Sequence, residues 1–215
     1  MELRSTTGAD LAQHWDAAYT VRGTTGVSWF QPDPTVSIRL IEHLKVPHDA
    51  AVIDIGGGAS LLTDSLLERE FTDVSVLDVS TAALDATHRR LGRDARVTLL
   101  NEDLLSWHPK RRFHLWHDRA VFHFLVSPPE RDAYLDILKS ALHPGGAVVI
   151  GTFDSDGPEY CSGLAVARYS TDELASWLGD GFEIVEACRE EHTTPAGIVQ
   201  PFTWVSARAA RGAVQ

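Results

Sequence analysis

Cysteine, basic charge and long apolar runs are all scarce in this chain of 215 residues. Cys161 and Cys188 are its two cysteines, too few for a disulfide framework. The formal net charge of −11 argues against broad electrostatic binding to DNA or RNA, which requires basic patches. No apolar run approaches the length of about 20 residues that spans a membrane, and the first residues lack the apolar core of a signal peptide. We therefore expect a protein of the cytoplasm.

The composition is that of an ordinary globular protein, with 44% hydrophobic and 23% charged residues. The length suits one α/β domain, and neither an internal repeat nor a low-complexity linker divides the chain. We expect a single domain over 1–215. Within it, 1–45 would form an N-terminal lid or helical segment, 46–208 the core and 209–215 a tail.

An apolar strand that runs into a glycine loop is the most informative feature. Residues 51–62 read Ala-Val-Ile-Asp-Ile-Gly-Gly-Gly-Ala-Ser-Leu-Leu. Because glycine has no Cβ atom, a ligand can lie against the main chain there, at the N-terminus of a helix. A second apolar run ends in Asp78, 24 residues after Asp54, where an acid is placed to bind a ribose diol. This pair predicts a nucleoside-containing cofactor.

Two common nucleotide-binding patterns are incomplete in this loop. The fingerprint Gly-x-Gly-x-x-Gly is matched at Gly56 and Gly58, but Leu61 stands at the third position. No Gly-Lys-Ser or Gly-Lys-Thr follows, which argues against a P-loop. Glycines also occur in many strand-to-helix turns for geometry alone, so the loop by itself leaves the cofactor open.

Seven strand-like runs predict the fold. The first five alternate with helical patterns, which favours right-handed βαβ units and a parallel sheet. The last two are joined by a loop over 192–199 that leaves no room for a helix, so they should pair antiparallel. We expect an α/β fold with a seven-stranded, mostly parallel sheet, a C-terminal antiparallel hairpin and helices on both faces. The runs are 51–55, 74–79, 96–101, 113–118, 147–153, 182–190 and 201–208.

Four segments in order resemble the class I S-adenosylmethionine-dependent methyltransferases. The glycine loop resembles the family's motif I, and Asp78 occupies the position at which the family carries its ribose-binding acid. Asn101-Glu102-Asp103-Leu104 resembles the adenine-contacting motif, and His143-Pro-Gly-Gly the turn into strand five. The resemblance covers about residues 12 to 208 and implies the Rossmann-like form of this fold. It implies cofactor contacts from Trp29, Asp54, Gly56, Gly57, Gly58, Asp78, Val79, Asp103 and Leu104.

Each of these acids also has a purely structural interpretation. Asp54 would order the glycine turn by accepting backbone N–H bonds, a role compatible with cofactor binding. Asp78 would cap the helix that begins near Thr81. Asp103 would be an exposed acid in a turn.

Two aromatic segments precede the first strand. His14-Trp15-Asp16-Ala-Ala-Tyr19 and Ser28-Trp29-Phe30-Gln-Pro resemble the N-terminal lid of thiol- and thiopurine-type methyltransferases, and also that of some elongation-factor lysine methyltransferases. Trp29 or Phe30 could attract a sulfonium by cation–π interaction or pack against the acceptor. The glycines and prolines around them suit a mobile lid. Alternatively, the aromatics only pack a helix and a turn onto the sheet.

The fourth strand ends in polar residues, which in a parallel sheet point into the ligand crevice. His117, Asp118, Arg119 and His123 are the candidates for catalysis and acceptor contacts, and either histidine could remove a proton near neutral pH. The structural alternative is an Asp118–Arg119 pair that orders the loop. No metal site is expected, because His114 and His117 would face opposite sides of a strand and the cysteines lack ligand spacing.

The resemblance implies methyl transfer from S-adenosyl-L-methionine, with S-adenosyl-L-homocysteine as product. The compact chain, which lacks an added recognition domain, favours a small-molecule acceptor, and the lid resemblance favours a thiol or other soft nucleophile. A protein lysine is the alternative, because the acidic balance would suit a basic protein partner. We expect neither a membrane nor a nucleic acid as partner.

Two further classes are open at this stage. The chain could be a non-catalytic module that only binds the adenosyl cofactor, or a nicotinamide-dependent oxidoreductase. Leu61 and the terminal hairpin oppose the second. Asp118-Arg119-Ala-Val also stands where methylators of amides and nucleobases carry an Asn-Pro-Pro-Tyr type motif, which argues against those acceptors.

Overall fold

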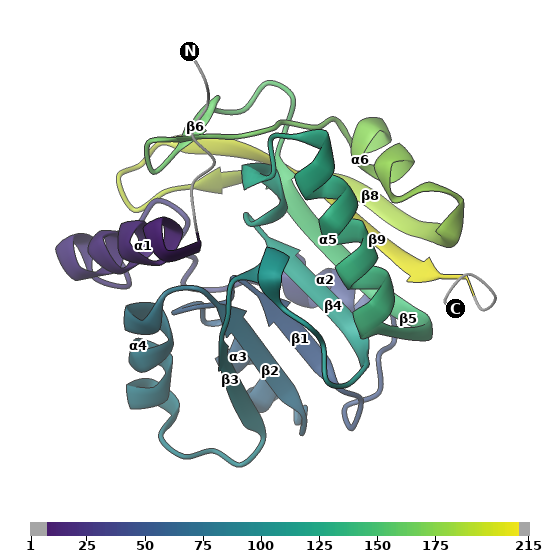
Figure 1. Cartoon of the computed structure of the whole chain (residues 1–215), viewed down its shortest axis with the longest axis horizontal. Coiled ribbons are helices and arrows are strands. Elements are labelled where there is room, and N and C mark those ends of the chain that lie inside the picture. The colour runs from purple at the N-terminus through teal and green to yellow at the C-terminus, as the bar shows by residue number, and fades with distance from the viewer. Residues whose placement is uncertain (1–7, 211–215) are drawn as a thin grey trace.

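The computed structural model describes residues 8–210 and contains a seven-stranded sheet (Figure 1). The strand order is β3-β2-β1-β4-β5-β9-β8, which confirms the predicted sheet. The first seven residues of the predicted lid and residues 211–215 of the predicted tail lie outside the described residues. The strands of the sheet are β1 (Val52–Ile55), β2 (Val74–Asp78), β3 (Val97–Asn101), β4 (Phe113–Arg119), β5 (Leu142–Phe153), β8 (Phe182–Thr193) and β9 (Val199–Ala209).

The first five strands run parallel, and the terminal hairpin supplies the antiparallel pairs. β1 lies between β2 and β4, with every residue of β1 buried on both faces of the sheet. Such continuous apolar runs are typical of parallel strands covered on both sides. β9 is antiparallel to both β5 and β8, so β8 runs parallel to the main sheet. The predicted hairpin is therefore confirmed.

Helices cover both faces of the sheet. In Figure 1, α5 and α6 lie in front of the sheet, and α2 and α3 lie behind it. One apolar cluster centres on Trp116 and Tyr134 beneath α5 and α6, and the other centres on Leu40 and Trp204 beside α2 and α3. The helices are α1 (Gly8–Arg22), α2 (Thr35–His43), α3 (Leu62–Glu68), α4 (Thr81–Leu91), α5 (Pro128–Ala141) and α6 (Thr171–Leu178). Short 3-10 turns occur at η1 (Leu104–Ser106), η2 (Phe122–Phe124) and η3 (Gly179–Gly181).

Capping boxes begin two of the helices in the structure. At the start of α6 the backbone N–H of Ser170 donates to Glu173 at 2.8 Å, and the hydroxyl of Ser170 accepts from the Glu173 N–H at 3.3 Å. Ser127 and Glu130 begin α5 in the same way. Each pair satisfies backbone donors that would otherwise lack a partner at a helix N-terminus.

The largest differences from the sequence-based expectation lie at the start of β5, in the terminal hairpin and in the segment after β5. β5 begins at Leu142 rather than 147, because the His-Pro-Gly-Gly turn lies within the strand and shifts its register on β4. β8 continues to Thr193 and β9 begins at Val199, so the loop between these two strands is shorter than expected. A small hairpin, β6 (Tyr160–Cys161) with β7 (Leu164–Ala165), follows β5 where the sequence suggested only a loop. No helix within residues 8–210 is long and apolar enough to cross a membrane.

Candidate functional site

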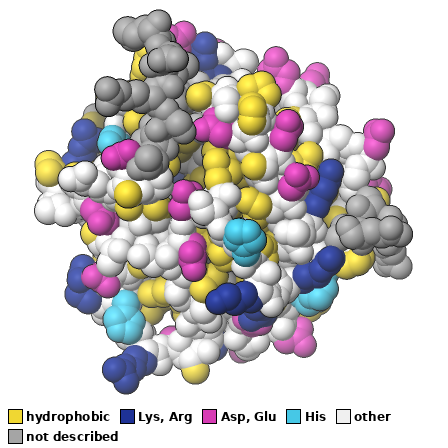
Figure 2. Space-filling view, viewed as in Figure 1, with side chains coloured by type: hydrophobic (Ala, Val, Ile, Leu, Met, Phe, Trp, Pro, Cys, Tyr) yellow, Lys and Arg dark blue, Asp and Glu magenta, His cyan; other side chains and the backbone are white. Residues whose placement is uncertain are grey.

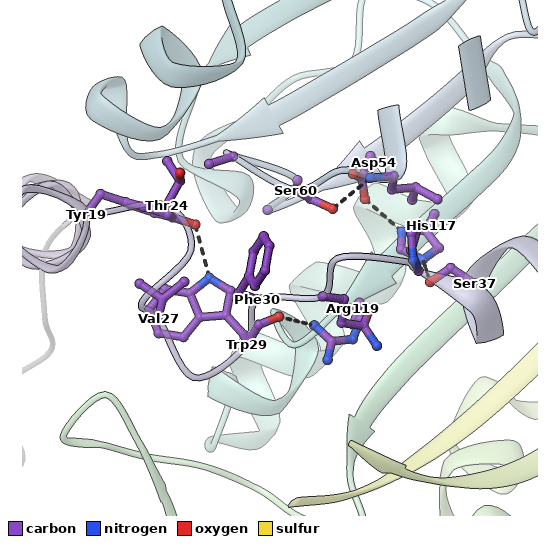
Figure 3. A pocket seen from close by; sticks show the side chains of 16 residues that line it. Tyr19, Thr24, Val27, Trp29, Phe30, Ser37, Asp54, Ser60, His117 and Arg119 are labelled. Carbon is purple, nitrogen blue, oxygen red and sulfur yellow. Dashed lines mark hydrogen bonds and ion pairs between the residues drawn. The ribbon is translucent and has the colours of Figure 1, made fainter. Parts of the chain in front are cut away.

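A pocket lies at the carboxyl ends of β1 and β4, beneath the segment that joins α1 to α2 (Figure 3). In a parallel sheet this edge is where ligands bind, because the loops after adjacent strands diverge there. The pocket is lined by Tyr19, Thr24, Val27, Trp29, Phe30, Gln31, Pro34, Ser37, Asp54, Gly56, Gly57, Ala59, Ser60, Leu62, His117 and Arg119.

The three consecutive glycines of the predicted loop are each required by their surroundings. Gly56 and Gly58 have positive φ angles of 63° and 39°, which side chains rarely adopt. A Cβ atom on Gly57 would lie 2.3 Å from Oδ2 of Asp54, and one on Gly58 would lie 2.6 Å from Oδ2 of Asp78. The loop thus brings bare backbone against both predicted acids, which is the arrangement that a nucleoside ligand would need.

Gly57→Ala is expected to lower the free energy of unfolding by about 1–3 kcal/mol, the usual cost of an added methyl group in a filled site. The new Cβ would collide with the carboxylate of Asp54 and with Val76. Urea unfolding of a double-mutant cycle with Asp54→Ala measures the coupling. The cost should fall when the carboxylate is absent, and an equal cost in both backgrounds would contradict this account.

Asp54 is buried at the end of β1, and only one of its two carboxylate oxygens has a partner. Oδ1 accepts a hydrogen bond of 2.7 Å from Nδ1 of His117, whereas Oδ2 has no partner among the described residues. A buried, unpaired carboxylate oxygen is costly and indicates a missing donor. Together with the glycine cradle it fits a ligand that presents an N–H group to this loop.

Asp78 ends β2 and is also buried. Its Oδ1 accepts a hydrogen bond of 2.7 Å from the backbone N–H of Ser80. Burial raises the pKa of the Asp78 carboxyl to about 7; the bond from Ser80 opposes this rise, and the nearby carboxylates of Asp54 and Asp16 add to it. Ser80, not Asp78, is the N-cap of α4, since its hydroxyl accepts from the N–H of Ala83. Helix capping therefore does not explain the acid.

The predicted adenine-contacting residues follow β3 in the turn η1. Asp103 is half-buried and caps this turn, its Oδ1 accepting from the N–H of Leu105 at 3.2 Å. Leu104 is buried in the core cluster beneath α5. Val79, the residue after Asp78, accepts a hydrogen bond of 3.1 Å from the side-chain amide of Asn101. Like Asp78, these residues lie at this edge of the sheet and are not among the residues that line the pocket.

The predicted lid segment covers the pocket with aromatic side chains. Trp29 donates from Nε1 to the Tyr19 hydroxyl at 3.1 Å and packs edge-on against Trp15. The same residue accepts a hydrogen bond of 2.8 Å at its backbone oxygen from Arg119. The tip of the β8–β9 hairpin also reaches this segment, where Nε2 of His192 lies 2.8 Å from the backbone oxygen of Ser28. Trp29 and Phe30 thus line the pocket, and Trp29 also packs against the aromatic side chains of α1.

Asp16 of α1 connects the lid helix to the cofactor edge. Its carboxylate accepts hydrogen bonds from the Ser80 hydroxyl at 2.7 Å and from the Ala82 N–H at 3.0 Å, at the N-terminus of α4. An acid is favoured there because the first N–H groups of a helix lack partners and the helix dipole is positive at that end.

Of the four predicted catalytic residues, the structure brings two to the pocket. His117 and Arg119 line it, and Asp118 and His123 do not. Asp118 accepts hydrogen bonds from the hydroxyl of Tyr134 and the N–H of Val121, and burial raises the pKa of its carboxyl to about 6. Successive side chains of a strand point to opposite faces, so Asp118 faces α5 while its neighbours face the pocket.

Arg119 and His123 carry buried nitrogen atoms without partners. Nε and Nη2 of Arg119 and both ring nitrogens of His123 are inaccessible and unbonded among the described residues. Arg119 also lies over the ring of Phe202, at 4.7 Å from its centre. Burial lowers the pKa of Arg119 to about 10, and burial together with Arg119 lowers the pKa of His123 to about 3. This His123 ring is therefore neutral at physiological pH.

Sequence reasoning missed Ser37. Its hydroxyl lies 2.9 Å from Nε2 of His117 and it lines the pocket from α2. The available signal was a serine on the apolar face of a helix, next to Ile38 and three residues before Leu40, both buried. Within the described residues, no group of three or more His, Cys, Asp and Glu side chains is arranged to hold a metal ion.

Comparison with known proteins gives one family match and several relatives. The profile of a methyltransferase domain family matches residues 53–148. Human EEF1A lysine methyltransferase 2 is 26% identical over 190 residues, covering 81% of this chain and 75% of that protein. Thiocyanate methyltransferase 1 of Brassica oleracea is 28% identical over 140 residues, covering 61% of this chain and 59% of that protein.

A solved structure supports the fold independently. The 1,6-didemethyltoxoflavin-N1-methyltransferase of Burkholderia thailandensis, solved with bound 1,6-didemethyltoxoflavin and S-adenosylhomocysteine, superposes with a TM-score of 0.69 at 21% identity. The alignment covers 98% of this chain and 93% of that chain. The shared architecture includes the region where the pocket lies.

Proposed function

Because this chain belongs to the class I S-adenosylmethionine-dependent methyltransferases, we propose that it methylates a small, soft nucleophile that carries negative charge, such as a thiolate. The cofactor, when bound, supplies the activated methyl group. The observation that carries the acceptor assignment is the enclosed guanidinium of Arg119, whose Nε and Nη2 have no partner in the pocket wall.

The cofactor is assigned to the sheet edge from β1 to β3. Asp54 and the glycine loop would hold its amino-acid end, and Asp78 its ribose. The adenine would be held by Val79, the residue after β2, and by Asp103 and Leu104 in the turn after β3. Trp29 and the lid, within residues 1–45, would close over the core of 46–208 and exclude water.

Among the described residues, neither histidine nor Asp118 is free at the pocket to act as a general base, and the unpaired oxygen of Asp54 is assigned to the cofactor. Both nitrogens of His117 are engaged, by Asp54 and by Ser37. His123 does not line the pocket, and Asp118 is occupied on the opposite face of β4. An acceptor that must lose a proton during the reaction would lack a proton acceptor here, whereas one that is already anionic would need only alignment and exclusion of water.

Arg119 would bind such an acceptor through its free N–H groups. A guanidinium donates to anions in a fixed planar arrangement, and enclosure strengthens each bond. Its remaining donor holds the backbone oxygen of Trp29, so the same side chain ties the lid to the acceptor position. The relative from Brassica oleracea, named for thiocyanate, is likewise named for a small, soft anion.

A protein lysine is the second candidate, favoured by the relative that covers most of the chain. The acidic net charge of −11 would suit a basic protein. On the face seen in Figure 2, acidic and basic side chains are interspersed, so this face shows no continuous basic surface for a nucleic acid. Against lysine stands Arg119, whose positive charge in the pocket would repel an ammonium group.

An acceptor panel tests the proposal. Purified enzyme with S-adenosylmethionine is offered small thiols, thiocyanate and iodide on one side and an unmethylated elongation factor on the other, and S-adenosylhomocysteine formation is measured. We expect turnover with the small anions, with a pH profile that follows the acceptor's own ionisation. Labelling of the elongation factor alone would favour the lysine reading, and cofactor binding without turnover on any acceptor would favour a binding module.

Arg119→Gln supplies the matched variant. It should raise KM for the anionic acceptor about 10- to 100-fold, the cost of losing hydrogen bonds to a charged partner. The affinity for S-adenosylhomocysteine should change little. Arg93→Gln, an exposed arginine on the loop after α4, is the control. Equal acceptor KM values for the wild type and Arg119→Gln would remove Arg119 from the acceptor site.

A further inference from the structure

Three buried polar side chains from three separate elements form a continuous chain of hydrogen bonds at the floor of the pocket. Ser37 comes from α2, His117 from β4 and Asp54 from β1, and Figure 3 shows them in line. The Ser37 hydroxyl lies 2.9 Å from Nε2 of His117, and Nδ1 of His117 lies 2.7 Å from Oδ1 of Asp54. Their relative exposures are 1%, 2% and 2%.

The direction of these bonds follows from the chemistry of the groups. A carboxylate only accepts, so Nδ1 of His117 carries a hydrogen and donates to Asp54. In the neutral ring, Nε2 then has a lone pair and accepts from the Ser37 hydroxyl. Asp54 thereby fixes the tautomer, since the partner of one ring nitrogen generally fixes the role of the other, and the Ser37 hydroxyl serves as the partner of Nε2.

The pairing is built into the sheet. Asp54 and His117 are register partners on the adjacent parallel strands β1 and β4, so their side chains leave the same face side by side. The bond to His117 holds Oδ1 and leaves Oδ2 against the backbone of Gly57, where it has no partner within the described structure. The orientation of the unpaired oxygen is thus set by the ring.

We propose that His117 is a positioning residue that acts through Asp54 on the amino-acid end of the cofactor, and that Ser37 holds His117 in this role. This rests on the cofactor assignment of the proposed function. His117 neither removes a proton nor contacts the acceptor. Its function is to keep the Asp54 carboxylate turned so that Oδ2 accepts from an N–H group above the glycine loop.

Two substitutions test the roles of the two ring nitrogens of His117 separately. His117→Asn places an amide N–H close to the position of Nδ1 and keeps a donor for Asp54. His117→Gln extends the amide to the position of Nε2, toward Ser37, and leaves Asp54 without its donor. Titration calorimetry with S-adenosylhomocysteine, which has an amino-acid end, is compared with 5′-methylthioadenosine, which lacks one.

S-adenosylhomocysteine should bind His117→Gln about 30-fold more weakly than the wild type and His117→Asn within about threefold of it. Methylthioadenosine should bind wild type and both variants alike. A merely structural role would lower the affinities for both ligands by the same factor, or would lower the affinity for S-adenosylhomocysteine equally in both variants. Either result would overturn the proposal.

Ser37→Ala keeps the test decisive where a histidine variant fails to fold. This variant leaves the His117 ring in place without its second partner. It should lower the affinity for S-adenosylhomocysteine about fivefold and leave the affinity for methylthioadenosine unchanged. No change for S-adenosylhomocysteine would refute the role of Ser37. A wild type that binds neither ligand would instead refute the cofactor assignment, so the two failures are distinguishable.

Discussion

Asp78→Asn is expected to lower the affinity for S-adenosylhomocysteine about 100-fold at pH 8. At the same pH it is expected to raise the free energy of unfolding. The loss of affinity follows because a carboxylate accepts from both hydroxyls of a ribose diol, and hydrogen bonds to a charged group contribute about 1.5–3 kcal/mol each. An amide presents one acceptor and one donor, so one of the two hydroxyls loses its partner.

The gain in stability follows from the raised pKa of Asp78. Burial lifts it from 3.8 to about 7, so between these values the folded protein binds a proton that the unfolded chain releases. The stability contributed by this proton is complete below pH 3.8 and is lost as the pH rises to about 7. The buried charge therefore costs about 2–4 kcal/mol at pH 8, and asparagine removes that cost.

Urea unfolding between pH 4 and pH 8 measures this effect. The difference in free energy of unfolding between Asp78→Asn and the wild type should grow from pH 4 to pH 7 and be constant above it. Asp85→Asn, on the exposed face of α4, is the control and should show no such growth. A flat difference across the whole range would mean that Asp78 is not the strained acid described here.

The same shift predicts how cofactor affinity depends on pH. Ribose hydroxyls favour the ionised carboxyl, which the free protein loses below about pH 7. The affinity of the wild type for S-adenosylhomocysteine should therefore fall by up to about tenfold per pH unit below that value. An acid whose charge is unfavourable in the free protein and useful only with ligand is typical of a functional site.

The sequence could predict this edge of the molecule because its features are local. A strand and three glycines are contiguous in the chain, Asp78 follows 24 residues after Asp54 at the end of the next strand, and β1 and β2 are neighbours in the sheet. The spacing therefore carries the geometry directly. The same holds for the capping boxes, each of which spans four residues of one chain segment.

The floor of the pocket could not be predicted because its bonds join distant segments. Ser37 and His117 are 80 positions apart, and nothing in the surroundings of either residue indicates the other. The sequence does predict that the side chain of Asp118 lies on the opposite face of β4 from those of its two neighbours. Alternation along a strand places His117 and Arg119 on one face and Asp118 on the other, but the sequence does not say which face holds the ligand.

Asp118→Ala is expected to lower the free energy of unfolding by about 3–5 kcal/mol, with cofactor binding retained by the folded fraction. The carboxylate is the centre of a buried network. Oδ2 accepts from the Tyr134 hydroxyl at 2.7 Å, which itself accepts from Nε1 of Trp116, and Oδ1 accepts from the N–H groups of Val121 and Phe122. Alanine would leave three of these donors buried without partners, each costing about 1–3 kcal/mol.

Asp118→Asn tests whether these bonds or the charge is responsible. Its amide oxygen can still accept from the two backbone N–H groups, and the raised pKa of Asp118, about 6, means that its charge is itself unfavourable at neutral pH. We therefore expect a much smaller loss than for alanine, measured by urea unfolding at pH 7. If alanine instead left stability unchanged and abolished turnover, Asp118 would act on the substrate, and the assignment of the pocket to the opposite face of β4 would be wrong.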